Sequence, residues 1–120
     1  MGTSMITLDE KRAFLARFDQ VQAEVHRIAC GHGWWTTEKE DGTCIALMHS
    51  ELSEALEACR LGNPPSEICD GVSEVEIELA DVIIRIMDFA CRRGLHVSDA
   101  ILAKMEYNRE RPYKHGDKKF

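Results

Sequence analysis

The segment from Ser73 to Gly94 has the sequence SEVEIELADVIIRIMDFACRRG. Its apolar residues point in nearly every direction around a helix axis, and one polar stripe runs between them. At about 100° per residue, the stripe falls within a sector of roughly 80°; it consists of Glu78, Asp81, Arg85, Asp88 and Arg92. The pattern predicts a helix over Ser73 to Arg93, capped by Gly94 and buried on most of its sides.

Helical signals also precede this segment. Thr7 and Glu10 form a capping-box pattern ahead of apolar residues spaced three and four apart, which predicts a helix over about Leu8 to Cys30. A second helix fits Thr43 to Leu61, where the sequence Gly62-Asn63-Pro64-Pro65 ends it.

A last helix is expected from the N-cap candidate Ser98 to about Arg109, before Pro112. No segment alternates with a period of two, so strands are not expected. The sequence therefore predicts an all-α fold, with the helices forming a four-helix bundle.

Size and composition fit one domain. The chain has 120 residues, of which 44% are hydrophobic and 30% are charged. We expect one domain over 1–120, with residues 1–6 disordered and 112–120 forming a basic tail. No charge-free stretch approaches the roughly 20 apolar residues that span a bilayer, so a membrane partner is not expected.

The cysteines point to a reducing compartment. There are five, an odd number, with no C-x-x-C pair among them. This usage favours buried thiols in a cytoplasmic protein over disulfides or a zinc site.

Charge is unevenly distributed along the chain. Residues 38–88 hold thirteen acidic and three basic side chains, whereas residues 104–120 hold three acidic and six basic ones. Because an acidic centre repels the phosphate backbone, a nucleic-acid partner is not expected. A function in which acidic clusters bind cations is compatible with this charge distribution.

Two pairs of carboxylates share helical spacing. Glu51 and Glu54 lie three residues apart, among apolar neighbours, on the helix expected over Thr43 to Leu61, and Glu78 and Asp81 repeat the spacing later. Two such pairs on facing helices bring four carboxylates to one point, and oxygen ligands without sulfur or imidazole select Mg²⁺ or Mn²⁺. The alternative is that these carboxylates are solvated. A di-iron bundle is disfavoured, because no histidine stands in a Glu-x-x-His pattern.

A third group lies near the C-terminus. Lys104, Asn108 and Arg111 recur at i, i+4 and i+7, so they project in one direction. Beside a metal site they suit a polyphosphate, because cationic and amide donors bind its oxygens. A solvated, mildly basic helix end is the alternative.

Together these motifs resemble the MazG-like members of the all-α nucleoside triphosphate pyrophosphohydrolase superfamily. The resemblance covers roughly residues 8–116 and rests on Ala46–Ala58, Glu78–Arg85 and Lys104–Gly116. It implies an oligomeric four-helix module, a homodimer or homotetramer. The implied reaction is hydrolysis of a nucleoside or deoxynucleoside triphosphate to the monophosphate and pyrophosphate, by attack of water at the α-phosphorus.

The resemblance also implies roles for individual residues. Glu51, Glu54, Glu78 and Asp81 would bind Mg²⁺ and serve catalysis, while Lys104, Asn108 and Arg111 would contact the phosphates. Ser50 stands where many relatives have a further glutamate, so the number of metal ions is open.

Candidate base-binding residues lie around Gly33. The deoxycytidine triphosphate branch of the superfamily is similar in having a histidine nine residues before a tryptophan, as His26 and Trp35 are here. Trp34 and Trp35 can stack on a base or plug the space between helices, and Trp35 is preferred for stacking because of this register. Two other classes stay open: a nucleotide- or metal-binding module without turnover, and a structural helical dimerisation protein.

Overall fold

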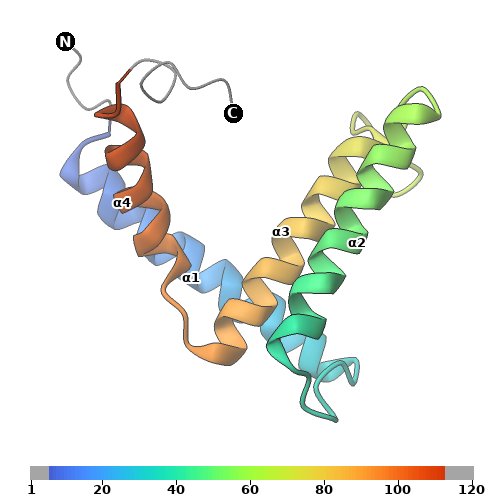
Figure 1. Cartoon of the computed structure of the whole chain (residues 1–120), viewed down its shortest axis with the longest axis horizontal. Coiled ribbons are helices and arrows are strands. Elements are labelled where there is room, and N and C mark those ends of the chain that lie inside the picture. The colour runs from blue at the N-terminus through green and yellow to red at the C-terminus, as the bar shows by residue number, and fades with distance from the viewer. Residues whose placement is uncertain (1–5, 113–120) are drawn as a thin grey trace.

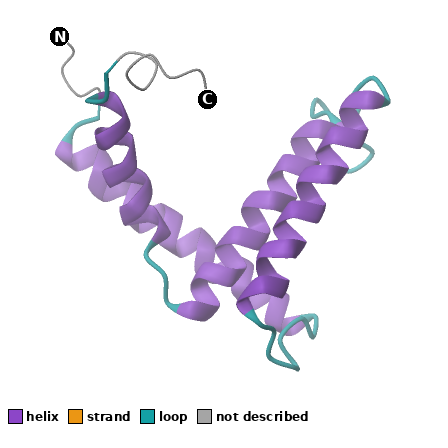
Figure 2. Ribbon diagram, in the orientation of Figure 1, coloured by secondary structure: helices purple, strands orange, loops and turns teal. Residues whose placement is uncertain are grey.

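In the computed structural model, which describes residues 6–112, the chain is built from four helices. They are α1 (Leu8–Gly31), α2 (Asp41–Arg60), α3 (Glu74–Arg93) and α4 (Val97–Arg109). No strand occurs among the described residues, whose sole β-type pairing is an isolated bridge between Pro65 and Ser73 (Figure 2). The all-α prediction is confirmed. Most of the predicted disordered start and basic tail lies outside the described residues.

Local sequence signals set the start of α1 and both ends of α3. The Thr7 hydroxyl accepts a hydrogen bond from the Glu10 backbone N–H at 3.1 Å, and the Glu10 carboxylate accepts one from the Thr7 N–H at 2.8 Å. The same reciprocal box caps α3 through Ser73 and Glu76. Gly94 ends α3 in the left-handed region, at a φ of 66°.

The N-cap prediction for α4 is wrong. The N-cap residue is His96, and Ser98 lies inside the helix, only 1% exposed. Its hydroxyl donates to Asp19 Oδ1 on α1 at 2.7 Å. A buried hydroxyl needs a partner, and here a tertiary contact supplies the partner instead of a cap.

The helices form an open V (Figure 1). Helices α2 and α3 pack side by side as one arm, the C-terminal half of α1 crosses α3, and α4 lies along the other half of α1. The radius of gyration is 17.1 Å, against about 13 to 14 Å expected for a compact chain of this length. The bundle prediction is therefore met only in part, because α4 stands apart from the α2–α3 arm.

Much of the apolar surface of α3 is uncovered. Leu79, Ile83 and Ile84 are 44%, 52% and 45% exposed. The prediction that this helix is buried on most sides is wrong for a single chain: among the described residues its main helix contacts are with α1 and α2, and they leave these side chains exposed.

The cysteines are free but mostly not buried. Cys30, Cys59 and Cys69 are exposed, whereas Cys44 is buried. The buried-thiol prediction is therefore wrong for three of the five. Among the described helices, none combines the length and the apolar character that crossing a membrane requires.

Candidate functional site

Three of the four predicted metal ligands meet between α2 and α3. Glu51, Glu78 and Asp81 each offer a carboxylate oxygen, and these oxygens all lie within 4.8 Å of one another. All three side chains are partly buried. We call these residues the acidic cluster. Glu54, one helical turn from Glu51, is exposed at its edge.

The surroundings of Glu78 raise the pKa of its carboxyl group. Burial is the largest cause, and the negative charges of Asp81, Glu54 and Glu51 act in the same direction. Glu54 is therefore close enough to act on the cluster electrostatically. Partly buried carboxylates that repel one another are stabilised by a cation, and this all-oxygen set fits a hard divalent ion such as Mg²⁺.

One arginine faces the acidic cluster. The Nε of Arg85 donates to Glu51 Oε1 at 2.8 Å, and the side chains of Arg85 and Glu51 are only 25% and 16% exposed. The guanidinium carbon also lies 5.0 Å from the centre of the Trp34 ring, within the range of a cation–π contact.

A cleft opens beside the acidic cluster. Its volume is about 320 Å³, and it is lined by Val25, Ile28, Ala29, Trp34, Glu51, Asp81, Ile84, Arg85 and Asp88. The residues from α1 are apolar, while the carboxylates and Arg85 come from α2 and α3. Ligand pockets begin at about 300 Å³, so the cleft suits a small molecule with an apolar and a charged end.

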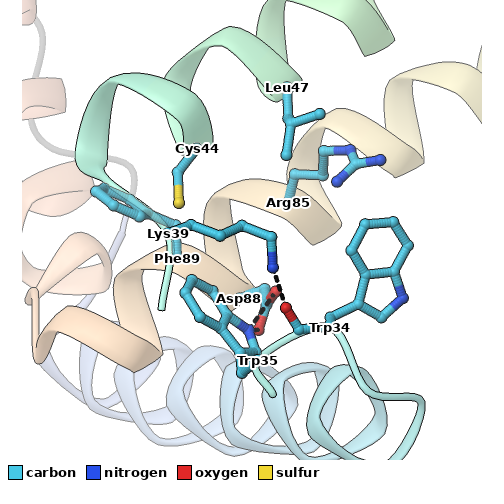
Figure 3. A pocket seen from close by; sticks show the side chains of 8 residues that line it. All are labelled: Trp34, Trp35, Lys39, Cys44, Leu47, Arg85, Asp88 and Phe89. Atoms are coloured by element: carbon cyan, nitrogen blue, oxygen red, sulfur yellow. Dashed lines mark hydrogen bonds between the residues drawn. The ribbon is translucent and has the colours of Figure 1, made fainter. Parts of the chain in front are cut away.

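Trp34 and Trp35 have different surroundings (Figure 3). The Trp35 indole N–H donates to both oxygens of Asp88, at 2.9 and 3.0 Å, and His26 Nδ1 lies 2.6 Å from the same carboxylate. Trp34 is 47% exposed and lines the cleft. The preference for Trp35 as the stacking residue rested on register alone, and the geometry of the cleft favours Trp34.

The loop that carries both tryptophans is fastened by charges. The Nζ of Lys39 donates to the Trp34 carbonyl and lies 4.6 Å from the centre of the Trp35 ring. On α3, Arg92 and Arg93 pair with Glu38 of the loop. These ion pairs hold the loop against the end of α3.

The predicted phosphate-binding residues lie elsewhere in the chain. Lys104 and Asn108 are exposed on α4, and Arg111 follows the end of that helix. Lys104 and Arg111 both lie over Tyr107, at 4.5 and 5.6 Å from its ring centre. Because α4 belongs to the other arm of the V, the structure does not bring this group to the acidic cluster within one chain (Figure 1).

Arg85 and Asp88 were not assigned as site residues from the sequence. Both belong to the polar stripe of α3, which was the available signal, but the stripe alone does not reveal which loop or helix faces each member. Tyr113, Lys114 and His115, which extend the motif of the last helix, fall outside the described residues.

Comparisons of the chain with protein-family models, curated proteins and solved structures found no match.

Proposed function

We propose that this protein is a Mg²⁺-dependent nucleoside triphosphate pyrophosphohydrolase of the MazG-like type. The observation that carries the proposal is the acidic cluster on the wall of a cleft that Trp34 also lines. A nucleotide has the matching chemistry, because its base is flat and stacks while its phosphates bind through metal ions. The substrate is a nucleoside or deoxynucleoside triphosphate.

Glu51, Glu78 and Asp81, with Glu54 at the edge, are the residues that would hold Mg²⁺. An ion bound there would lower the pKa of a water molecule and neutralise charge on the phosphates. One carboxylate of this set accepts the proton of the attacking water. Attack at the α-phosphorus releases pyrophosphate and leaves the monophosphate with the base against Trp34.

We also propose that the active unit is a homodimer or homotetramer. Lys104, Asn108 and Arg111 suit the triphosphate, yet they lie on the arm away from the acidic cluster of their own chain. A second copy would bring its α4 to this cluster. The exposed apolar residues of α3 provide a surface for that contact.

The uncovered apolar surface favours one competing function, a helical dimerisation protein with solvated carboxylates. The two differ in their response to ligands. A dimerisation protein melts at the same temperature with or without Mg²⁺ and nucleotide, whereas the proposed enzyme is stabilised by both. A module that only binds nucleotide is stabilised as well but releases no product.

The deciding experiment measures pyrophosphate release from a panel of ribonucleoside and deoxynucleoside triphosphates with Mg²⁺. In water labelled with heavy oxygen, the label is expected in the monophosphate. Glu78→Gln should abolish release, while Glu57→Gln, an exposed position on α2, should not. Orthophosphate and a diphosphate as first products, or an unaffected Glu78→Gln variant, would contradict the proposal.

A further inference from the structure

Arg85 lines the cleft and contacts two of the other residues that line it. Its Nε binds Glu51 at 2.8 Å on one side, and its guanidinium lies over Trp34 at 5.0 Å on the other. Among the residues that line the cleft, Arg85 is the sole cationic side chain. It therefore contacts both a candidate metal ligand and the candidate stacking residue.

The other arginines of α3 are engaged elsewhere. Arg92 and Arg93 pair with Glu38, and Arg93 also pairs with Asp41 at 2.8 Å. Asp88, the remaining charged residue of the cleft wall, binds Trp35 and His26. Arg85 is the member of this helix whose partner is a carboxylate of the acidic cluster.

A divalent ion held by the acidic cluster would compete with Arg85 for Glu51, which accepts a hydrogen bond from the Arg85 Nε. A Glu51 oxygen that accepts a hydrogen bond from the guanidinium coordinates a divalent ion more weakly. The positive charge of the guanidinium also repels that ion. A guanidinium binds phosphate in the same planar, forked manner as it binds carboxylate. When Glu51 coordinates a metal ion, the guanidinium of Arg85 stays beside Trp34, and its N–H groups are available to bind phosphate.

We infer that Arg85 exchanges partners: it holds Glu51 in the metal-free protein and contacts the α-phosphate of a nucleotide once a divalent cation has taken Glu51. The position fits, because a nucleotide with its base on Trp34 and its phosphates at the acidic cluster has its α-phosphate between them. The inference rests on the proposed function. It adds to the proposed site a phosphate-binding residue that comes from the same chain as the acidic cluster.

The metal half of the inference is tested without nucleotide. Mn²⁺ binding is titrated by electron paramagnetic resonance on the full chain, because free Mn²⁺ gives a distinct signal. Arg85→Gln should bind Mn²⁺ about fivefold more tightly than wild type, since a competing partner and a repelling charge are both removed. Arg60→Gln, an exposed arginine on α2 that pairs with Glu57, should bind as wild type does.

The phosphate half is tested by turnover. Arg85→Gln should lower kcat for pyrophosphate release by about 100-fold, the usual effect of removing one charge-stabilising donor. Arg85→Lys keeps the charge but loses the planar pair of N–H donors, so its kcat should lie between those of wild type and Arg85→Gln. Tighter metal binding together with slower turnover is the signature, since a residue that only braces α2 against α3 would not produce it.

Several results would overturn the inference. A folded Arg85→Gln variant, verified by circular dichroism, that binds Mn²⁺ no more tightly than wild type would make Arg85 a structural brace. Unchanged kcat in that variant would remove the phosphate contact. If Arg85→Gln does not fold, Arg85→Lys with wild-type Mn²⁺ affinity and kcat would overturn the inference as well.

Failure of the proposed function gives a different pattern. Absence of Mn²⁺ binding to wild type would overturn both proposals. Tighter Mn²⁺ binding in Arg85→Gln, with no pyrophosphate released by wild type from any nucleotide, would overturn the enzyme and the phosphate contact but uphold the competition for Glu51.

Discussion

Glu78 is a carboxyl group whose ionisation the fold opposes. Burial and the nearby charges of Asp81, Glu54 and Glu51 raise its pKa above the ordinary value of 4.5. The folded chain thus holds this proton more tightly than the unfolded chain does. In the absence of metal, the stability linked to Glu78 is present below pH 4.5 and is lost as the pH rises through the raised pKa.

Glu78→Gln removes this ionisation while keeping the shape of the side chain. In a chelating buffer near pH 7, the variant should melt at a higher temperature than wild type. The difference should vanish in acid, below the ordinary pKa of 4.5, where the wild-type carboxyl is also neutral. Thermal denaturation followed by circular dichroism at both pH values checks this.

Glu57→Gln serves as the control, because Glu57 is exposed on α2 and pairs with Arg60. It should leave the melting temperature nearly unchanged at both pH values. Equal melting temperatures for wild type and Glu78→Gln at neutral pH would show that repulsion among the carboxylates of the acidic cluster does not lower the stability of the fold.

The two tryptophans of the loop from α1 to α2 have different roles. Trp35 is fixed by Asp88 and covered by Arg92, whose guanidinium carbon lies 5.0 Å from its ring centre. Trp34 meets the cleft. One residue therefore anchors the loop, and its neighbour is left available to a ligand.

Trp34→Ala should raise KM for the best nucleotide about tenfold, because base stacking contributes about 1 to 3 kcal/mol. Its melting temperature should stay close to that of wild type. Trp35→Ala should instead reduce the free energy of unfolding by about 2 kcal/mol, since it removes a half-buried ring and leaves Asp88 with fewer donors. Steady-state kinetics and denaturant unfolding of both variants provide the measurements.

The reverse result is equally informative. If Trp35→Ala raises KM while the stability is kept, and Trp34→Ala changes neither quantity, the register argument from the sequence is right and the geometry of the cleft is misleading. Nucleotide quenching of tryptophan fluorescence in each variant offers an independent check.

Some helix ends can be predicted from the sequence alone, whereas contacts between helices cannot. Ends of helices depend on neighbours along the chain, so the capping residue Thr7 and the stop at Gly94 follow from local patterns. The i, i+3 spacing likewise predicts which carboxylates share a face. The partners of Asp88, Arg85 and Ser98 are tertiary: each lies on another helix or in the loop, and no local pattern encodes it.

A single chain exposes more surface than a compact protein of its size does. Its accessible surface is 8964 Å², whereas a compact protein of this mass has about 6,600 Å². Apolar residues in helical register contribute to it, at positions Ile45, Leu52 and Leu56 of α2 and Leu79 and Ile83 of α3. Such rows are typical of helix faces that pack against another subunit.

If a second copy covers these faces and brings its α4 to the acidic cluster, each active site combines two chains. Asp81→Asn and Lys104→Ala then damage opposite halves of the site. Each variant alone should have strongly reduced pyrophosphate release. In a dimer that exchanges subunits, about half of the molecules are mixed, and each mixed dimer has one intact site of two, so the mixture should recover about a quarter of wild-type activity.

Mixing Asp81→Asn with Glu51→Gln is the matched control, because both changes affect the same acidic cluster and no arrangement of two chains restores an intact site. Size-exclusion chromatography with light scattering establishes the oligomer before mixing. Recovery only in the first mixture would establish that α4 acts across the interface. Activity no greater than the mean of the two parents, despite proven subunit exchange, would mean that Lys104 does not complete the partner's site, and a role for α4 in catalysis would then require the V to close within one chain.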